Sequence, residues 1–486
     1  QLEREGRVIV SFEKRRARMI ELLTAAATTL KATPLMPDEL IDEVTALVEW
    51  PVVYESGFEA EFLDVPPECL VLTMQQHQRY FPLQDAGGKL MNRFLLVSHL
   101  EANDGGEAIR AGNARVVRAR LADAKFFYDQ DRKRTLESRV PLLSGVVYHN
   151  KLGSQLERIE RVIGIAVQIA RMVGADVNHV ERAARLAKAD LRTEMVGEFP
   201  ELQGTMGRYY ALHDGEAVDV ADAIAEHYKP RFADDELPAS AVGICVALAD
   251  KLEALVGLFG IGERPTGDKD PYGLRRHAIG ILRILTERQV PLELTRLFTI
   301  ATEELGPRIV IDRTRLLAEL HEFFLDRLTG LLREQGYTAN EVDAVVSQGP
   351  TRVDLVPAQL AAVRAFMQLP EAESLVAANK RIGNILKKAD AINANFDPAR
   401  LFEPAEKDLS TAYARVKPMA EQLFIKGDYT GMLKSLVPLK LPVDRFFDDV
   451  MVNVEDEGLR NNRLALLASL RETMNRVADL SRLSAL

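Results

Sequence analysis

From residue 106 to the end of the chain, apolar residues recur at spacings of three and four. The pattern is clear in LERIERVIGIAVQIARMVG at residues 156–174 and in ELHEFFLDRLTGLLREQG at residues 319–336. Side chains at these spacings share one face of an α-helix, so most of this sequence is predicted to be helical. The chain has 486 residues, which is more than one hydrophobic core needs. We therefore expect a mainly α, multidomain protein.

Residues 50–100 are the one region whose pattern favours strands, because they combine β-branched and aromatic residues with Pro and Gly-Gly breaks. An opening helix, from Phe12 to about Leu30, precedes this region. Within it, MQQHQRYFPL brings His77 and Tyr80 to the start of a hairpin that turns at Gly87-Gly88. This polar cluster is either a ligand contact or the end of a strand with aromatic residues in the core. The region predicts one α+β domain near the N-terminus.

Composition limits the classes of function. The net charge is −10, which argues against indiscriminate nucleic-acid binding and against DNA as a partner, but leaves local basic sites open. The two cysteines, Cys69 and Cys245, are far apart, so we expect no disulfide framework and a cytoplasmic location. The longest uncharged apolar stretch, Ala239 to Ala249, is too short to span a membrane. The chain begins at Gln1 without an initiator Met, so we expect a fragment of a longer protein.

Two local runs of positive charge are candidates for contact with RNA phosphates. Between residues 110 and 125, five cations stand against one acid, and Arg115 and Arg118 share a predicted helix face. The second run, NKRIGNILKK, has no acid and carries Lys380, Arg381, Lys387 and Lys388. Both runs also fit the alternative of a solvated helix face.

A third candidate lies near the carboxyl end, where residues 459–470 form a predicted amphipathic helix. Its first turn carries Arg460, Asn461 and Arg463. Arginine and asparagine at a helix start can contact a phosphate and an unstacked base. The alternative is ordinary helix capping.

Residues 145–260 follow the helix order of the HD metal phosphohydrolases, which hold a divalent metal through His, His-Asp and Asp ligands. Here the first His position falls near Arg158, and the His-Asp pair reads Ala189-Asp190. Only Asp190, His227 and Asp250 are left as candidate ligands, so we expect a degenerate domain without a metal. Further along, Asp270 is predicted as the N-cap of a helix that starts at Pro271.

Taken together, five long segments strongly resemble the β subunit of bacterial glycyl-tRNA synthetase. They are HQRYFPL, GNARVVRARLADAKFFYDQD, KADLRTEMVGEFPELQGTMGRYYA, PTGDKDPYGLRRHAIGILRIL and DRFFDDVMVNVEDEGLRNNRLALL. Their order is that of the family, and the resemblance covers essentially the whole chain. Relative to the family, the front segment is missing.

The resemblance implies a domain order. Residues 1–144 are expected to be similar to the substrate-selecting domain of phenylalanyl-tRNA synthetase β subunits. Residues 145–290 would be the HD-like helical domain and 291–394 a helical linker or body domain. Residues 395–486 would be a helical domain of the anticodon-binding type.

The resemblance also implies the function. The chain would be the tRNA-binding, non-catalytic subunit of a glycine–tRNA ligase, in a heterotetramer of two α and two β subunits. The α subunit would bind ATP, Mg²⁺ and glycine, and this chain would bind no cofactor and carry no catalytic residue. Two alternatives stay open: an HD-type phosphohydrolase, and an assembly scaffold that makes no contact with RNA.

Overall fold

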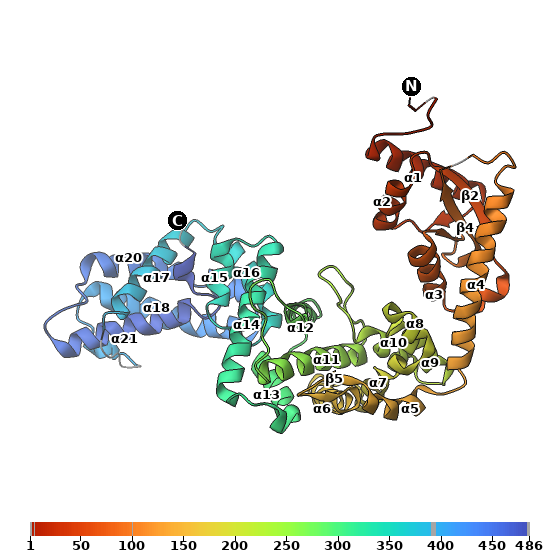
Figure 1. The fold of residues 1–486 in the computed structure, drawn as a ribbon. Coiled ribbons are helices and arrows are strands. Elements are labelled where there is room, and N and C mark those ends of the chain that lie inside the picture. Colours follow the sequence, from red (N-terminus) through yellow and green to blue (C-terminus); the bar gives the residue numbers. More distant parts are fainter. Residues whose placement is uncertain (1, 4, 100, 390–394, 484–486) are drawn as a thin grey trace. The chain divides into compact units, whose positions relative to one another are not determined.

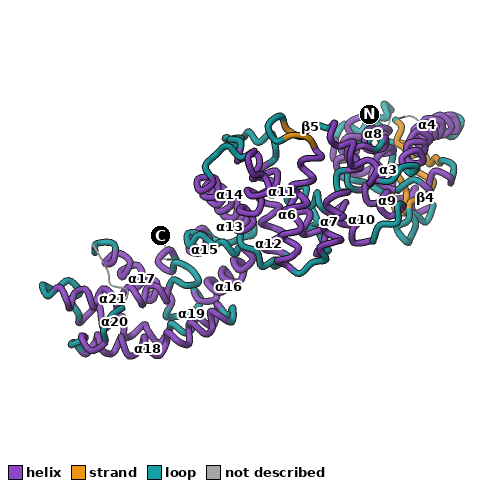
Figure 2. The backbone as a smooth tube through the Cα atoms, turned by 90° about the horizontal axis from the view of Figure 1, so that it is seen from below, coloured by secondary structure: helices purple, strands orange, loops and turns teal. Residues whose placement is uncertain are grey.

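A computed structural model describes residues 2–3, 5–99, 101–389 and 395–483. The chain divides into two compact units, one of residues 1–160 and 178–227 and one of residues 161–177 and 228–486. Helices dominate both, and the labelled strands belong to the first unit (Figures 1 and 2). This confirms the mainly α, multidomain prediction with one α+β region near the N-terminus. The bounds of the four predicted domains stay predictions.

The first unit begins with a small four-stranded sheet and the helices around it. These elements are α1 (Phe12–Thr29), β1 (Thr33–Pro34), α2 (Asp38–Leu47), β2 (Val52–Gly57), α3 (Pro67–Leu72), β3 (Phe81–Gln84), β4 (Leu90–Ser98) and α4 (Glu107–Asp131). The sheet is antiparallel with the order β1-β3-β4-β2. The opening helix and the β3–β4 hairpin are therefore confirmed. Residues 67–77 are helical instead of extended, because Pro66 and Pro67 fix the backbone for a helix start.

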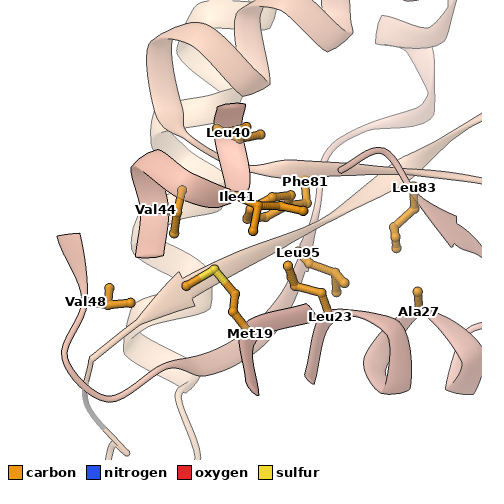
Figure 3. Packing of buried hydrophobic residues seen from close by; sticks show 10 residues of the cluster. All are labelled: Met19, Leu23, Ala27, Leu40, Ile41, Val44, Val48, Phe81, Leu83 and Leu95. Atoms are coloured by element: carbon orange, nitrogen blue, oxygen red, sulfur yellow. The ribbon is translucent and has the colours of Figure 1, made fainter. Parts of the chain in front are cut away.

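The core of this sheet domain is built from apolar residues at helical and strand spacings. Met19, Leu23 and Ala27 lie four apart on α1 and are at most 1% exposed. Figure 3 shows them facing Ile41 and Val44 of α2, with Phe81, Leu83 and Leu95 from the sheet. Tyr80, next to Phe81, is also buried and stacks on Phe94, so the core interpretation of Tyr80 is confirmed.

The last residue of the long helix α4, Asp131, is 2% exposed and binds four hydrogen-bond donors. Its carboxylate accepts from Nη2 of Arg139 at 3.1 Å and from the hydroxyl of Tyr210 at 3.0 Å. It also accepts from the backbone N–H groups of Glu194 and Met195, both at 2.9 Å. These two begin helix α8, whose first N–H groups have no partner within the helix. One carboxylate thus joins four elements.

Those elements belong to the helical half of the first unit. It contains α5 (Leu136–Arg139), the hairpin of β5 (Val147–His149) and β6 (Gly153–Ser154), α7 (Val177–Leu186), α8 (Glu194–Glu198), α9 (Thr205–His213) and α10 (Val218–Glu226). Helix α6 (Gln155–Val173) contributes residues to both units.

Asp190 is a second buried carboxylate in this half, with no exposed surface. One of its oxygens accepts from the N–H groups of Gly204 at 2.6 Å and Gly207 at 3.1 Å, at the start of α9. A Cβ on Gly207 would lie 3.0 Å from that oxygen and 2.6 Å from Ile224, so only glycine allows this approach. Burial raises the pKa of Asp190 to about 6.

The second unit is a helical array. It contains α11 (Ala241–Gly260), α12 (Leu274–Glu287), α13 (Leu294–Leu305), α14 (Arg313–Glu334), α15 (Ala339–Val346), α16 (Val356–Phe366), α17 (Ala372–Leu386), α18 (Pro404–Ile425), α19 (Tyr429–Lys434), α20 (Lys440–Asp449) and α21 (Glu457–Met474). A buried ion pair between Arg161 and Glu253 links α6 to α11, with Nε–Oε1 at 2.9 Å.

The predicted start of the helix at Pro271 is wrong, because α12 begins at Leu274 after Gly273, which has a φ of 65°. Asp270 does cap the helix, but from four residues upstream: its carboxylate accepts from the N–H groups of Leu274 and Arg275. Both cysteines are free and buried. None of the described helices combines the length and the apolar character that crossing a membrane requires.

We predict that Asp131→Asn lowers the free energy of unfolding by about 3–5 kcal/mol. The change leaves the buried Arg139 guanidinium without its counter-charge and turns an amide donor toward other donors. Chemical denaturation measures the effect. Asp129→Asn is the matched control, because Asp129 is on the same helix, is 45% exposed, and pairs among the described residues only with Lys125. We expect its cost to stay below about 1 kcal/mol. Equal losses in the two variants would contradict this account of Asp131.

A second prediction concerns pH. Folding raises the pKa of Asp190 to about 6, against about 3.9 in the unfolded chain. Between pH ~4 and ~6, Asp190 is therefore protonated in the folded protein and ionised in the unfolded chain. This group therefore stabilises the fold fully below pH ~4, and that contribution of about 3 kcal/mol is lost as pH rises to ~6.

Asp190→Asn should remove this part of the pH dependence. Thermal midpoints of both proteins at pH 4.5 and 7 test it, since every other titrating group cancels in the comparison. Parallel pH profiles for the two proteins would refute the assignment.

Candidate nucleic-acid interface

The carboxyl-terminal helices carry most of the predicted RNA-binding residues. Helices α17 and α21 pack against each other, and α18 and α20 complete the group (Figure 1). Helix α21 begins as a capped helix, because the Asp456 carboxylate accepts from the N–H of Leu459 at 2.8 Å. The predicted helix over residues 459–470 is confirmed and is longer, from Glu457 to Met474.

Arg463 is not available to RNA in this structure. Its side chain is 4% exposed, and its Nε and Nη2 both donate to Oε1 of the fully buried Glu406 on α18. Its Nη1 donates to the carbonyl of Met451 at 2.7 Å. The physical reason is that residues 462–467 all lie in the core, where a charge must be paired. We therefore remove Arg463 from the proposed RNA surface.

The other residues of this turn are better placed. Arg460 is half-buried, and its Nη1 donates to the carbonyl of Val454 at 3.0 Å, which leaves part of the guanidinium at the surface. Asn461 is half-buried as well. Asn462 is structural, since its amide exchanges hydrogen bonds with the backbone N–H and carbonyl of Asp397.

The basic run on α17 presents its cations at two places. Lys380 and Arg381 are exposed, and the Arg381 guanidinium lies 4.3 Å from the centre of the Phe447 ring, a cation–π contact. Lys387 and Lys388 are exposed at the end of the helix, and neither has an ion-pair partner among the described residues. The structure therefore keeps all four side chains at the surface.

Beside Lys387 lies a groove that the sequence did not predict. Its volume is about 580 Å³, and we call it the α17–α21 groove. It is lined by Gln348, Leu386, Ala468, Arg471, Glu472, Asn475 and Arg476. The signal that could have identified it is the group of polar residues at the end of α21, in RETMNR, which follows the mostly apolar stretch LALLASL. From the sequence alone, a polar helix end of this kind is indistinguishable from a solvent-exposed turn, because the position of the neighbouring helix is not known.

In the first unit, Arg115 and Arg118 lie on α4, as predicted, and both are exposed. Arg118 pairs with Glu59 at 2.6 Å, whereas Arg115 has no ion pair within the described residues. Arg118 also lines a groove of about 620 Å³ between α4 and the strands β2 and β4, together with Arg93 and Arg110. Because Arg93 and Arg118 each pair with a glutamate, the net charge of this groove is small.

The three candidate ligands left from the HD pattern, Asp190, His227 and Asp250, are not arranged to bind a metal ion. Asp190 caps α9, as described above, and His227 is fully buried with Nδ1 2.6 Å from the carbonyl oxygen of Ile224. Near the first His position, the Arg158 guanidinium stacks over the Tyr148 ring at 4.4 Å. Among the described residues, no group of three or more His, Cys, Asp and Glu side chains, Asp250 included, is arranged to bind a metal ion. The geometry offers no support for the phosphohydrolase alternative.

His77, the other candidate of the first unit, is exposed and stacks on the Phe199 ring at 5.6 Å. Among the described contacts of His77 there is no carboxylate and no nucleophile, so the structure assigns this histidine no chemical role.

Comparison with known proteins agrees with this geometry. Residues 1–347 match the family described as glycyl-tRNA synthetase beta subunit, and residues 375–486 match the DALR anticodon binding domain. The second match begins inside α17, which fits the packing of α17 against α21.

Relatives with the same description align over the whole chain. The glycine–tRNA ligase beta subunit of Thiobacillus denitrificans is 58% identical over 488 residues, 100% of this chain and 69% of the relative. The subunit of Paracidovorax citrulli is also 58% identical, over 100% of this chain and 68% of the relative. Family match, identity and coverage together lead to one conclusion: this chain belongs to the family of glycyl-tRNA synthetase β subunits.

Proposed function

We propose that this chain binds tRNA(Gly) and holds it in position for a partner α subunit that attaches glycine. The observation that carries the proposal is the carboxyl-terminal helical group, whose family match is an anticodon-binding domain and whose surface presents cations beside a polar groove. Phosphate contacts position an RNA, and base contacts specify it. Both kinds of side chain occur here within one domain.

The division of labour that we propose is the one that the family resemblance implies. The exposed cations Lys380 and Arg381 on α17, Lys387 and Lys388 at its end, and Arg115 on α4 supply attraction to the RNA backbone. The α subunit would bind ATP, Mg²⁺ and glycine and carry out the bond making in the cytoplasm, in an assembly of two α and two β subunits. This chain then contributes by orientation, since holding the acceptor end near the reacting group lowers the entropic part of the barrier.

We predict that the double substitution Lys387→Ala and Lys388→Ala weakens tRNA(Gly) binding. It should also flatten the dependence of log affinity on log salt by about 0.7–0.9 for each phosphate that the variant no longer neutralises. Titration of the chain with tRNA(Gly) at several salt concentrations measures both effects. Lys407→Ala is the matched control, because Lys407 is an exposed lysine of the same domain, on the first turns of α18, and we expect it to leave the slope unchanged.

In the complex with the α subunit, the same double variant should raise the tRNA concentration needed for glycylation. Glycine activation with ATP should change little, because that step needs no tRNA in this scheme. Unchanged affinity and salt slope would argue for the scaffold alternative, in which the RNA contacts belong to the α subunit. A large loss of glycine activation would overturn the proposed division of labour.

A further inference from the structure

We propose that a cavity at the start of α12 binds the phosphate group of a phosphate monoester. We call this cavity the α12 pocket. Its volume is about 200 Å³, and all of its lining residues belong to the second unit. They come from α11, from the first turn of α12 and from the loops that precede these two helices, which lie side by side (Figure 1). The site lies outside the carboxyl-terminal helical group and is independent of the proposed function.

The lining of the α12 pocket carries an excess of positive charge. Arg231, Lys251 and Arg276 are permanent cations, and among the described lining residues Asp250 is the one carboxylate. One carboxylate offsets part of the repulsion between three cations but does not neutralise them. Because the whole chain has a net charge of −10, this excess is a local feature of the pocket. A cavity lined in this way attracts an anion.

Lys251 places one of these charges inside the protein. The residue is 2% exposed, and its ammonium donates to the carbonyl of Lys229 at 2.7 Å. Its aliphatic part runs beside Gly280 of α12, where a Cβ would lie 3.0 Å from Cε, so the absence of a side chain there makes room for the lysine. Charges attract each other more strongly away from bulk water. A buried ammonium in the wall of a cavity therefore binds an anion more tightly than a surface lysine does.

Arg276 supplies a charge that is accessible from solvent. It is exposed on the first turn of α12 and has no ion pair among the described residues. Its guanidinium lies close to Gly273, where a Cβ would be 2.9 Å from Nη2. A guanidinium can donate two parallel hydrogen bonds to a phosphate group. Arg276 is thus suited to close the pocket over an anion that Lys251 contacts from within.

The volume and the charge of the pocket select the class of anion. About 200 Å³ is below the range of ~300–1,000 Å³ that is usual for whole small molecules, so the pocket has room for a terminal group. A phosphodiester has two substituents and a single negative charge, and a carboxylate also has a single charge. A phosphate monoester has one substituent and a charge of about −1.5 to −2 at pH 7. The monoester therefore fits both the size and the charge.

Apolar residues next to the pocket can receive the substituent. A second cavity of about 70 Å³ shares Pro230, Arg231 and Arg276 with the α12 pocket and is lined in addition by Phe232 and Ile279. Phe232 is 62% exposed, which leaves its ring available for contact. A nucleoside attached to the phosphate would find an aromatic surface here. A free mononucleotide and the 5′ end of an RNA both present this combination.

Titration calorimetry of the full chain with inorganic phosphate tests the site, with potassium chloride holding the ionic strength constant. We expect one phosphate to bind per chain. Arg276→Ala should weaken this binding at least tenfold, because charge-assisted hydrogen bonds are lost. Dimethyl phosphate, a diester with one negative charge, should bind at least tenfold more weakly than inorganic phosphate.

Arg296→Ala is the matched control. Arg296 is also an exposed arginine without an ion pair among the described residues, but it lies on α13 and does not line the pocket. Its variant should bind phosphate as the wild-type chain does. No saturable binding by the wild-type chain, equal affinity in Arg276→Ala, or equal affinity for dimethyl phosphate would overturn the assignment.

Two further titrations distinguish the sources of the phosphate. Tighter binding of AMP than of inorganic phosphate would identify a mononucleotide. A preference for tRNA(Gly) with its 5′ phosphate over the same tRNA without it, abolished by Arg276→Ala, would identify an RNA end. If neither preference is found, the monoester assignment fails. If the chain binds AMP but no tRNA(Gly), the proposed function fails while the α12 pocket stands.

Discussion

The buried carboxylate of Asp131 is the contact on which the first unit depends. It ends the long helix α4 and accepts hydrogen bonds from a guanidinium, a phenol and the two N–H groups that open α8. A buried charge is tolerated only when its hydrogen-bonding capacity is satisfied, and here each oxygen has two donors. The orientation of α4, and with it the surface that carries Arg115 and Arg118, follows from this contact.

The second unit uses the same physical solution at its carboxyl end. Arg463 and Glu406 bind each other in the core between α18 and α21, and Asn462 holds the backbone at Asp397. These contacts use the side chains of Asn462 and Arg463 to hold the fold together. Arg460 and Asn461 at this start stay partly exposed, and at the other end of the helix Arg471, Glu472 and Arg476 line the groove beside α17. Packing thus decides which of several similar side chains can take part in recognition.

Similar residue types play different roles here because their surroundings differ. Asp190 is a candidate ligand of the predicted HD pattern, but one of its oxygens caps α9, and burial raises its pKa to about 6. His227 is buried against the carbonyl of Ile224 in the same helical half. The HD-like domain stays a prediction, and in the structure Asp190 and His227 are part of the packing.

Periodicity and composition alone determined the helical character, the strand-rich region at residues 50–100, the opening helix and the long helices α4 and α21, because these features depend on local spacing of apolar residues. The hairpin of β5 and β6 at residues 147–154 was not predicted. The five segments shared with the family determined which family to expect. Helix starts next to prolines were less predictable, as at residues 67–77 and at Leu274, since a proline permits a helix start without requiring one.

The tertiary structure decided which of the candidate residues are accessible at the surface. A sequence shows that Arg460, Arg463 and Arg471 are arginines on one helix, and it predicts the same chemistry for each. Only the placement of Glu406, Gly383 and Gln348 from other elements shows that Arg463 is neutralised in the core and that Arg471 lines a groove. Burial and pairing are properties of contacts distant in sequence, and for this reason no local pattern could supply them.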